Sequence, residues 1–111
     1  KHGFHIHQLG DITNGCDPTG GHYNPFSGQH GGPDTQDRHY GDLGNLEEDN
    51  YGNIKTILTD KVATLTGTYS INGRSMVLHS REDDLGRGGN TGSLSSGNAG
   101  SRMGCCVIGY S

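Results

Sequence analysis

Histidines are the residues of this sequence whose number and spacing could do chemistry, because seven of them occur in 111 residues. His5 and His7 lie two positions apart in an alternating segment. Residues i and i+2 of a β-strand project from the same face, so both imidazoles can reach one point. His79 ends a later apolar segment. Three or four imidazoles around one ion suit copper, which accepts tetragonal nitrogen ligation.

A second group of candidate ligands lies in one glycine-rich stretch with the spacing H-x7-H-x8-H-x2-D. Its members are His22, His30, His39 and Asp42. Three imidazoles and one carboxylate fit a tetrahedral Zn²⁺ site. The alternative is a scatter of surface histidines with a weak adventitious metal site. The combined spacing of the loop group, the H-x-H pair and His79 favours a metal centre over that alternative.

The three cysteines, Cys16, Cys105 and Cys106, cannot all pair within the chain. A bridge from Cys16 to either of the other two would close a loop of about 90 residues, which the chain-entropy model values at roughly 4 to 5 kcal/mol. Neighbouring cysteines rarely pair with each other. The sequence therefore predicts one bridge and one free thiol, and the residues alone leave the partner of Cys16 open.

Short strands must position these side chains, because apolar residues alternate over brief segments and no helical period stands out. We expect strands at residues 1–7, 42–47, 53–59, 74–79 and 102–110, with the second and third joined by a hairpin turn at 50–52. Residues 62–68 fit either a strand or an ordered loop. Two long loops, 8–41 and 81–101, carry much of the candidate chemistry, as long loops in compact domains often do. The pattern predicts an all-β fold.

The composition agrees with one β domain spanning residues 1–111, since the chain holds 21 glycines, no Trp and only 28% hydrophobic residues. Disorder is the alternative, but a net charge of −4 is modest and the apolar residues cluster in strand-like runs. No Lys/Arg run exists to neutralise phosphates, so we expect no nucleic-acid partner. No apolar stretch is long enough to span a bilayer, so we expect no membrane partner either.

Several segments resemble the copper/zinc superoxide dismutase family. GFHIHQLGD at residues 3–11 is similar to that family's copper-ligand signature, and GNAGSRMGCCVI at residues 97–108 is similar to its second signature. Further family motifs follow in order between them: HYNP at 22–25, HGGP at 30–33, RHYGDLGN at 38–45 and DDLG at 83–86. The resemblance covers essentially the whole chain.

The resemblance implies two metal sites. Copper would be bound by His5, His7, His22 and His79. Zinc would be bound by His22, His30, His39 and Asp42. His22 would bridge the metals as an imidazolate, an anion that two cations stabilise. In the family mechanism this bridge opens when copper is reduced, and the proton then taken up by His22 helps to form peroxide.

The resemblance also implies roles for residues around the metals. Asp83 would link a copper histidine to a zinc histidine and fix their tautomers. Arg102 would dock the anion beside copper through its planar guanidinium. The family disulfide would join Cys16 to Cys105 and leave Cys106 free. Residues 90–96 depart from the family, because they carry no charge where active members carry charged residues that guide superoxide.

The implied fold is a Greek-key β-barrel or sandwich, of which this chain would supply about five of eight strands. The family's first three strands have no counterpart in residues 1–111. We therefore expect an incomplete barrel whose exposed sheet self-associates or forms a homodimer. The chain would convert superoxide to O₂ and H₂O₂ with copper and zinc as cofactors. Two alternatives are a truncated, catalytically poor metal-binding domain and the dismutase-like domain of a copper chaperone. A copper chaperone is also an expected partner. The expected compartment is the cytoplasm, with the extracellular space as the alternative.

Overall fold

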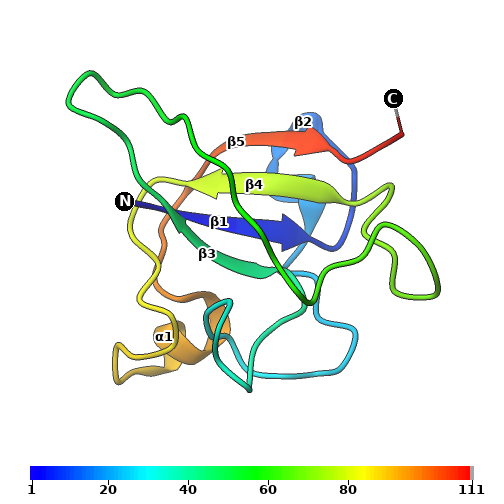
Figure 1. The fold of residues 1–111 in the computed structure, drawn as a ribbon, viewed down its shortest axis with the longest axis horizontal. Helices are drawn as coiled ribbons and strands as arrows, with labels where there is room; N and C mark the ends of the chain where they lie inside the picture. The colour runs from blue at the N-terminus through cyan, green and yellow to red at the C-terminus, as the bar shows by residue number, and fades with distance from the viewer. Residues whose placement is uncertain (111) are drawn as a thin grey trace.

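A four-stranded antiparallel sheet organises the protein in the computed structural model, which describes residues 1–110 (Figure 1). The strand order is β3-β1-β4-β5. The bounds are β1 (His2–His7), β3 (Asp42–Leu46), β4 (Ser75–His79) and β5 (Arg102–Val107). The edges of this sheet are β3 and β5, and within the described residues it does not close into a barrel. The all-β prediction is confirmed.

Strand alternation separates the apolar residues from the candidate ligands. Ile6 pairs with Met76 and His5 pairs with Val77, and directly paired residues of an antiparallel sheet share a face. Ile6 therefore points into the core, where it is buried with Tyr23, Leu43 and Ile71. The opposite face carries the candidate ligands of the sheet: His5, His7, Asp42 and His79. The register of β1 thus decides which face can hold a metal.

The expected strand at 53–59 is wrong. Asp49 closes the turn that the sequence predicted, since its Oδ1 accepts from the backbone N–H groups of Tyr51 and Asn53, each at 2.9 Å. No ladder follows the turn, and residues 53–60 run without regular structure across the sheet (Figure 1). Ile57 remains 94% exposed there, so the alternating apolar pattern finds no neighbouring strand to pack on. Residues 62–68 form an irregular loop, the second of the two alternatives.

Both long loops contain short elements that the sequence did not predict. The first loop holds β2 (Thr13–Cys16) and the 3₁₀ turn η1 (Asp17–Thr19). The second holds α1 (Thr91–Ser96). Asn90 caps this helix by accepting from the N–H of Ser93 at 2.8 Å, and Gly97 ends it in the left-handed conformation. Six residues are too few to show a helical period. No helix among residues 1–110 is long and apolar enough to cross a membrane.

A disulfide ties the first loop to the last strand, because Cys16 at the end of β2 is bonded to Cys105 in β5. Their Cα atoms are 5.8 Å apart, within the usual range for a bridge. Cys106 is free and exposed. The pairing implied by the resemblance is confirmed, and it resolves the choice that the residues alone left open.

Candidate metal centre

Six of the seven histidines meet where the two long loops cover the ligand-bearing face of the sheet. Two groups of side chains each bring one ligand atom per residue within 4.8 Å of the others: His5, His7, His22 and His79 in one, and His5, His22, His30 and Asp42 in the other. We call them the strand cluster and the loop cluster. His5 and His22 belong to both groups, and the sharing of His22 is what the shared-ligand hypothesis requires.

The backbone fixes the tautomers of two rings in the strand cluster. Nδ1 of His7 lies 2.8 Å from the carbonyl of Gly20, and Nδ1 of His79 lies 3.2 Å from the carbonyl of Gly100. A carbonyl can only accept, so both Nδ1 atoms carry hydrogen and both Nε2 atoms present lone pairs. These Nε2 atoms face each other at 3.3 Å. Two acceptors at that distance repel unless a cation lies between them.

His5 presents a similar lone pair from the centre of the sheet. Its Nε2 donates to Oδ2 of Asp83 at 2.6 Å, which leaves Nδ1 as the acceptor. This Nδ1 is fully buried and has no hydrogen-bond partner within residues 1–110. A buried polar atom without a partner is costly and calls for an unseen ion or water. The strand cluster therefore offers unprotonated imidazole nitrogens, the donors that copper prefers.

Asp42 organises the loop cluster with one oxygen and exposes the other to the histidines. Its Oδ2 accepts from the backbone N–H groups of Gly31 at 2.9 Å and His39 at 2.8 Å. Its Oδ1 faces three ring nitrogens, Nδ1 of His30 at 3.0 Å, of His22 at 3.1 Å and of His39 at 3.3 Å. A tetrahedral zinc ion with bonds of about 2.0–2.1 Å has ligand–ligand edges of about 3.3 Å. These spacings fit that tetrahedron.

His39 is the member of the predicted zinc set that stands slightly apart. It is missing from the compact loop cluster, in which His5 takes its place. Its Nδ1 nevertheless lies 3.1 Å from Nδ1 of His22, besides its 3.3 Å distance from Asp42. His5 has a different neighbour for its second nitrogen, namely Asp83. Chemically, His39 suits the N₃O set better than His5 does, so from here on the loop cluster means His22, His30, His39 and Asp42.

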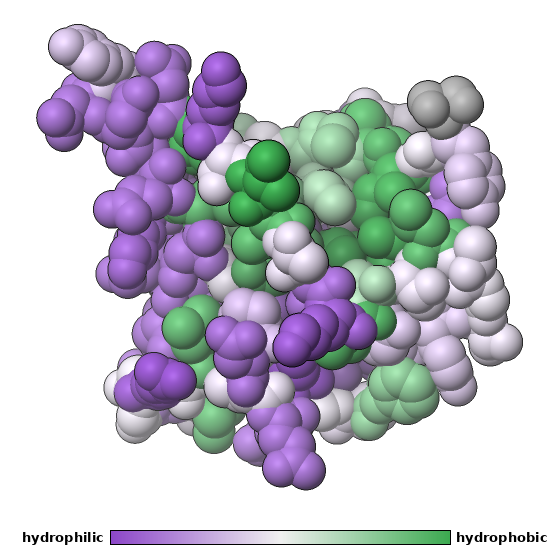
Figure 2. Space-filling model, viewed as in Figure 1, coloured by the Kyte–Doolittle hydropathy of each residue, from purple (hydrophilic) through white to green (hydrophobic). Residues whose placement is uncertain are grey.

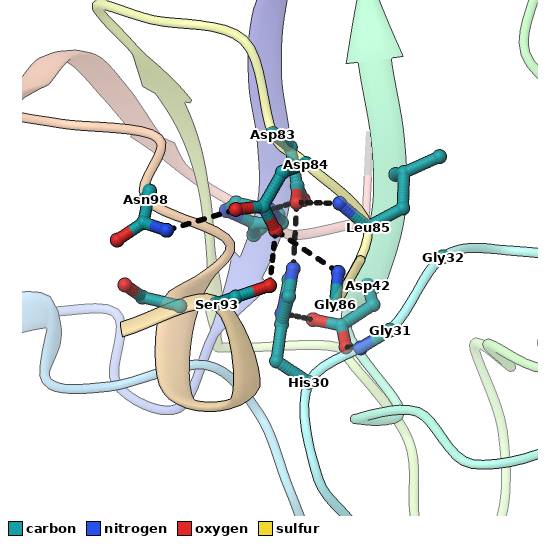
Figure 3. A network of polar contacts seen from close by, with 12 residues as sticks. His30, Gly31, Gly32, Asp42, Asp83, Asp84, Leu85, Gly86, Ser93 and Asn98 are labelled. Atoms are coloured by element: carbon teal, nitrogen blue, oxygen red, sulfur yellow. Dashed lines mark hydrogen bonds and ion pairs between the residues drawn. The ribbon is translucent and has the colours of Figure 1, made fainter. Parts of the chain in front are cut away.

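Asp83 joins the two clusters. Figure 3 shows one half of this link, in which His30 lies between Asp42 and Asp83. Oδ1 of Asp83 accepts from Nε2 of His30 at 2.7 Å, and its Oδ2 accepts from His5. His30 Nδ1 has no hydrogen-bonding geometry towards Asp42 despite its closeness. The two atoms therefore lie close together without a hydrogen bond between them, as two ligands of one ion would.

Asn45 holds Asp83 in place, and the sequence reading missed it. The Asn45 amide donates to the Asp83 carbonyl at 2.9 Å, and its oxygen accepts from the Asp83 N–H at 2.7 Å. Asn45 lies in β3, within the RHYGDLGN motif, and that motif was the only sequence feature that could have pointed to its role. Gly97 packs so closely behind the carboxylate that a Cβ atom would collide with it and with the His30 ring.

The electrostatics of the two clusters differ. Burial lowers the pKa of His7 to about 3 and that of His22 to about 4, so both rings are neutral at pH 7. Burial also acts against the charge of His30, but Asp42 and Asp83 outweigh it and raise the His30 pKa to about 9. Burial acts against the charge of Asp42 and Asp83 as well, but neighbouring histidines hold both carboxyl pKa values well below the usual range: His22, His30 and His39 for Asp42, and His30 and His5 for Asp83.

Arg102 stands beside the strand cluster at the start of β5. Its charge adds to burial in lowering the pKa of His7 and of His79. Its Nη1 donates to the carbonyls of Cys16 and Asp17, each at 3.1 Å. Within residues 1–110, Nε and Nη2 make no hydrogen bond, so one edge of the guanidinium remains available. Such an edge suits a small anion.

The comparisons with known proteins agree with this geometry. The family model of copper/zinc superoxide dismutase (SODC) matches residues 1–108. An extracellular Cu-Zn superoxide dismutase of Drosophila melanogaster is 58% identical over 98% of this chain and 60% of its own length. Superoxide dismutase [Cu-Zn] 5 of Dictyostelium discoideum is 52% identical over the whole chain and 73% of its own length.

A viral relative gives the same result. The Cu-Zn superoxide dismutase of Paramecium bursaria Chlorella virus 1 is 53% identical over 99% of this chain. The chain spans 59% of that relative's length, so the match covers part of the longer protein. With a family match over nearly every residue and a donor set that fits both metals, the chain belongs to the copper/zinc superoxide dismutase family.

Proposed function

We propose that this chain converts two superoxide anions and two protons to O₂ and H₂O₂ at a copper/zinc pair. The observation that carries the proposal is the sharing of His22 between two metal-ligand clusters. Copper would be held by His5, His7, His22 and His79. Zinc would be held by His22, His30, His39 and Asp42. Copper, when bound there, would supply the one-electron chemistry that both half-reactions need, whereas zinc has no redox chemistry.

His22 is the proposed proton carrier. Its Nδ1 faces Asp42 at 3.1 Å, so its Nε2, on the opposite side of the ring, is the atom that serves the strand cluster. The His22 pKa is lowered to about 4. A proton held at Nε2 would therefore be released readily to a forming peroxide.

Arg102 is the proposed anion-docking residue. Its Nη1 is held by the first loop, and its remaining edge can offer two parallel N–H groups to superoxide. We expect little guidance from residues 90–96, which carry no charge. Attraction of the substrate then depends on Arg102, Arg87, Arg81 and the metals, because positive charge around a partly desolvated site concentrates field lines.

Metal analysis combined with a superoxide-consumption assay tests the proposal. We expect one copper and one zinc per chain and rapid superoxide loss. Arg102→Glu should slow this loss by at least about tenfold. Lys55→Glu, at an exposed position of the irregular segment 53–60, makes the same change of charge away from the ligands and should have a small effect. A fully metallated chain without turnover would instead support the catalytically poor metal-binding alternative.

Besides the substrate, the partner that we propose is a second copy of this chain. Phe4, Met76 and Leu78 line a mainly apolar hollow with Cys106 on the face opposite the metal ligands. Figure 2 shows hydrophobic side chains gathered on the β4 and β5 side of this view. Edge strands and apolar faces favour pairing with another chain. Sedimentation at micromolar concentration tests this, and a monomer at all concentrations would contradict it.

Copper delivery and compartment also remain proposals. A copper chaperone is a proposed donor, which would be tested by comparing copper uptake from a chaperone and from free copper. We propose the cytoplasm as the compartment, with the extracellular space as the alternative, which the names of the Drosophila melanogaster and Caenorhabditis elegans relatives favour. Fractionation of the producing cells decides between them.

A further inference from the structure

Thr19 occupies an unusual position between Arg102 and the strand cluster. It is fully buried at the end of η1. Its hydroxyl donates to the carbonyl of Cys16 at 2.6 Å, and its oxygen accepts from Nη1 of Arg102 at 3.1 Å. The same oxygen lies 3.5 Å from Nδ1 of His7. A buried hydroxyl with both its donor and an acceptor site used is a fixed part of the local structure.

One short turn holds both the arginine and the histidine. Nη1 of Arg102 contacts two carbonyls of this turn, those of Cys16 and Asp17, in addition to Thr19. Nδ1 of His7 donates to a third carbonyl, that of Gly20. The Thr19 side chain is the only side chain among residues 1–110 that bonds Arg102, and it lies on the side of His7.

We propose that Thr19 is a positioning residue that sets the direction of the Arg102 guanidinium relative to the strand cluster, and so tunes the docking of a small monovalent anion. The inference rests on the proposed role of Arg102 in binding superoxide. Three acceptors at equal distance share the two hydrogens of Nη1. Without the hydroxyl, two backbone carbonyls remain, and the guanidinium can rotate towards either of them. A small misplacement of a docking group is costly because anion recognition depends on geometry.

Azide is the probe for the test, because it is a monovalent anion whose binding to the copper- and zinc-loaded chain is followed by absorbance. Thr19→Val removes the hydroxyl and keeps the shape of the side chain. We expect it to weaken azide binding and slow superoxide turnover by about three- to tenfold, the loss expected for one hydrogen bond. Thr19→Ser retains the hydroxyl and should stay within about twofold of the parent. Copper and zinc contents should not change in either variant.

A double-mutant cycle with Arg102→Gln shows whether Thr19 acts through Arg102. In that background, Thr19→Val should have no further effect on azide affinity. An equal loss with and without Arg102 would overturn the proposal. If Thr19→Val fails to take up metal, the smaller Thr19→Ala takes its place in the cycle, and the same criterion applies.

A measurement on the metal-free chain separates this proposal from the dismutase proposal. Hydrogen bonds at Nη1 slow rotation about the Cζ–Nη1 bond, which nitrogen NMR of Arg102 reports. We expect faster rotation in Thr19→Val and parent-like rotation in Thr19→Ser. Unchanged rotation in Thr19→Val would refute the positioning role even if the parent is active. The expected rotation and azide coupling in a parent without turnover would refute only the proposed function.

Discussion

The strand cluster and the loop cluster share His22 but are built differently. In the strand cluster, His5, His7 and His79 project from β1 and β4, and the sheet register fixes their spacing. In the loop cluster, His30 and His39 come from an irregular segment, and only Asp42 lies in a strand. The first therefore depends on backbone pairing, while the second depends on side-chain and backbone hydrogen bonds that hold a loop in place.

The chemistry follows the architecture. The strand cluster has no carboxylate, and burial keeps His7 and His22 neutral. The loop cluster places a carboxylate among imidazoles, and the flanking acids raise the pKa of His30. Neutral nitrogens suit copper, and a mixed nitrogen and oxygen set suits zinc. The comparison teaches that the position of a single carboxylate, that of Asp42, makes two neighbouring histidine clusters suit different metals.

The largest effect should come from the shared ligand. His22→Ala should weaken copper and zinc binding each by more than about 100-fold, because loss of a ligand exceeds the 10- to 100-fold cost of losing an outer partner. His79→Ala should weaken copper to a similar extent and leave zinc nearly unchanged. Competition with a chelator measures both affinities. Equal zinc loss in the two variants would show that the clusters do not share His22.

The second-largest effect should come from Asp83, because its two oxygens accept hydrogen bonds from one histidine of each cluster. Asp83→Asn should weaken both metals by about 10- to 100-fold. Asp84→Asn is the matched control, because the Asp84 carboxylate accepts from Ser93 at 2.6 Å and Asn98 at 2.8 Å but contacts no histidine (Figure 3). If both variants lose the same metal affinity, the role of Asp83 is structural and the clusters are not coupled through it.

The pH dependence should differ between the two metals. The His30 pKa of about 9 lies above its ordinary value, so in the metal-free chain His30 is protonated at pH 7. Zinc must displace that proton, and its affinity should rise by about tenfold per pH unit from pH 7 towards 9. The His7 and His22 pKa values of about 3 and 4 predict little change for copper over this range. Calorimetry in two buffers measures the released protons, and equal release for both metals would refute the difference.

The same shift predicts how the stability of the metal-free chain depends on pH. Because the folded-state pKa of His30 is raised, its contribution is fully present below about pH 6.5 and is lost as the pH rises through about 9. The midpoint of urea unfolding should therefore fall between pH 7 and 10. Saturating zinc should remove this decline, since a bound ion replaces the proton.

The smallest predicted effect concerns Arg38, a residue that supports the loop cluster and not the strand cluster. Arg38 donates to the carbonyls of Pro33, His39 and Tyr40 and pairs with Asp60 at 3.0 Å, so it braces the segment that carries His39. Arg38→Lys keeps the charge and loses the planar fork. Zinc affinity should fall by about three- to tenfold, and copper affinity should hold.

Arg87→Lys, on the exposed part of the second loop, is the control for Arg38→Lys and should change neither metal. A matching loss of copper affinity in Arg38→Lys would mean that the two clusters are not separately supported. The comparison of zinc and copper affinity in these two variants therefore tests whether the loop-held ligands have structural support that the strand-held ligands do not need.

The sequence predicted four of the five strands correctly, because β1, β3, β4 and β5 each carry their own alternating pattern. It could not predict that residues 53–59 stay irregular. A strand pattern describes side chains that suit a sheet, but a strand exists only where a neighbour accepts its hydrogen bonds. The elements β2 and α1 were missed for the opposite reason. Local hydrogen bonds and caps stabilise them in segments too short to show a period.

For the site, the sequence by itself determined the ligand types, through the H-x-H pair on a strand and the motifs that mark the family. Tertiary structure decided which nitrogen of each ring is available, because carbonyls and Asp83 fix the tautomers from distant segments. It also decided the contacts of Asn45 and Thr19, which no local pattern marks. Their partners lie 38 and 83 residues away in the chain, and only folding brings such groups within hydrogen-bonding distance.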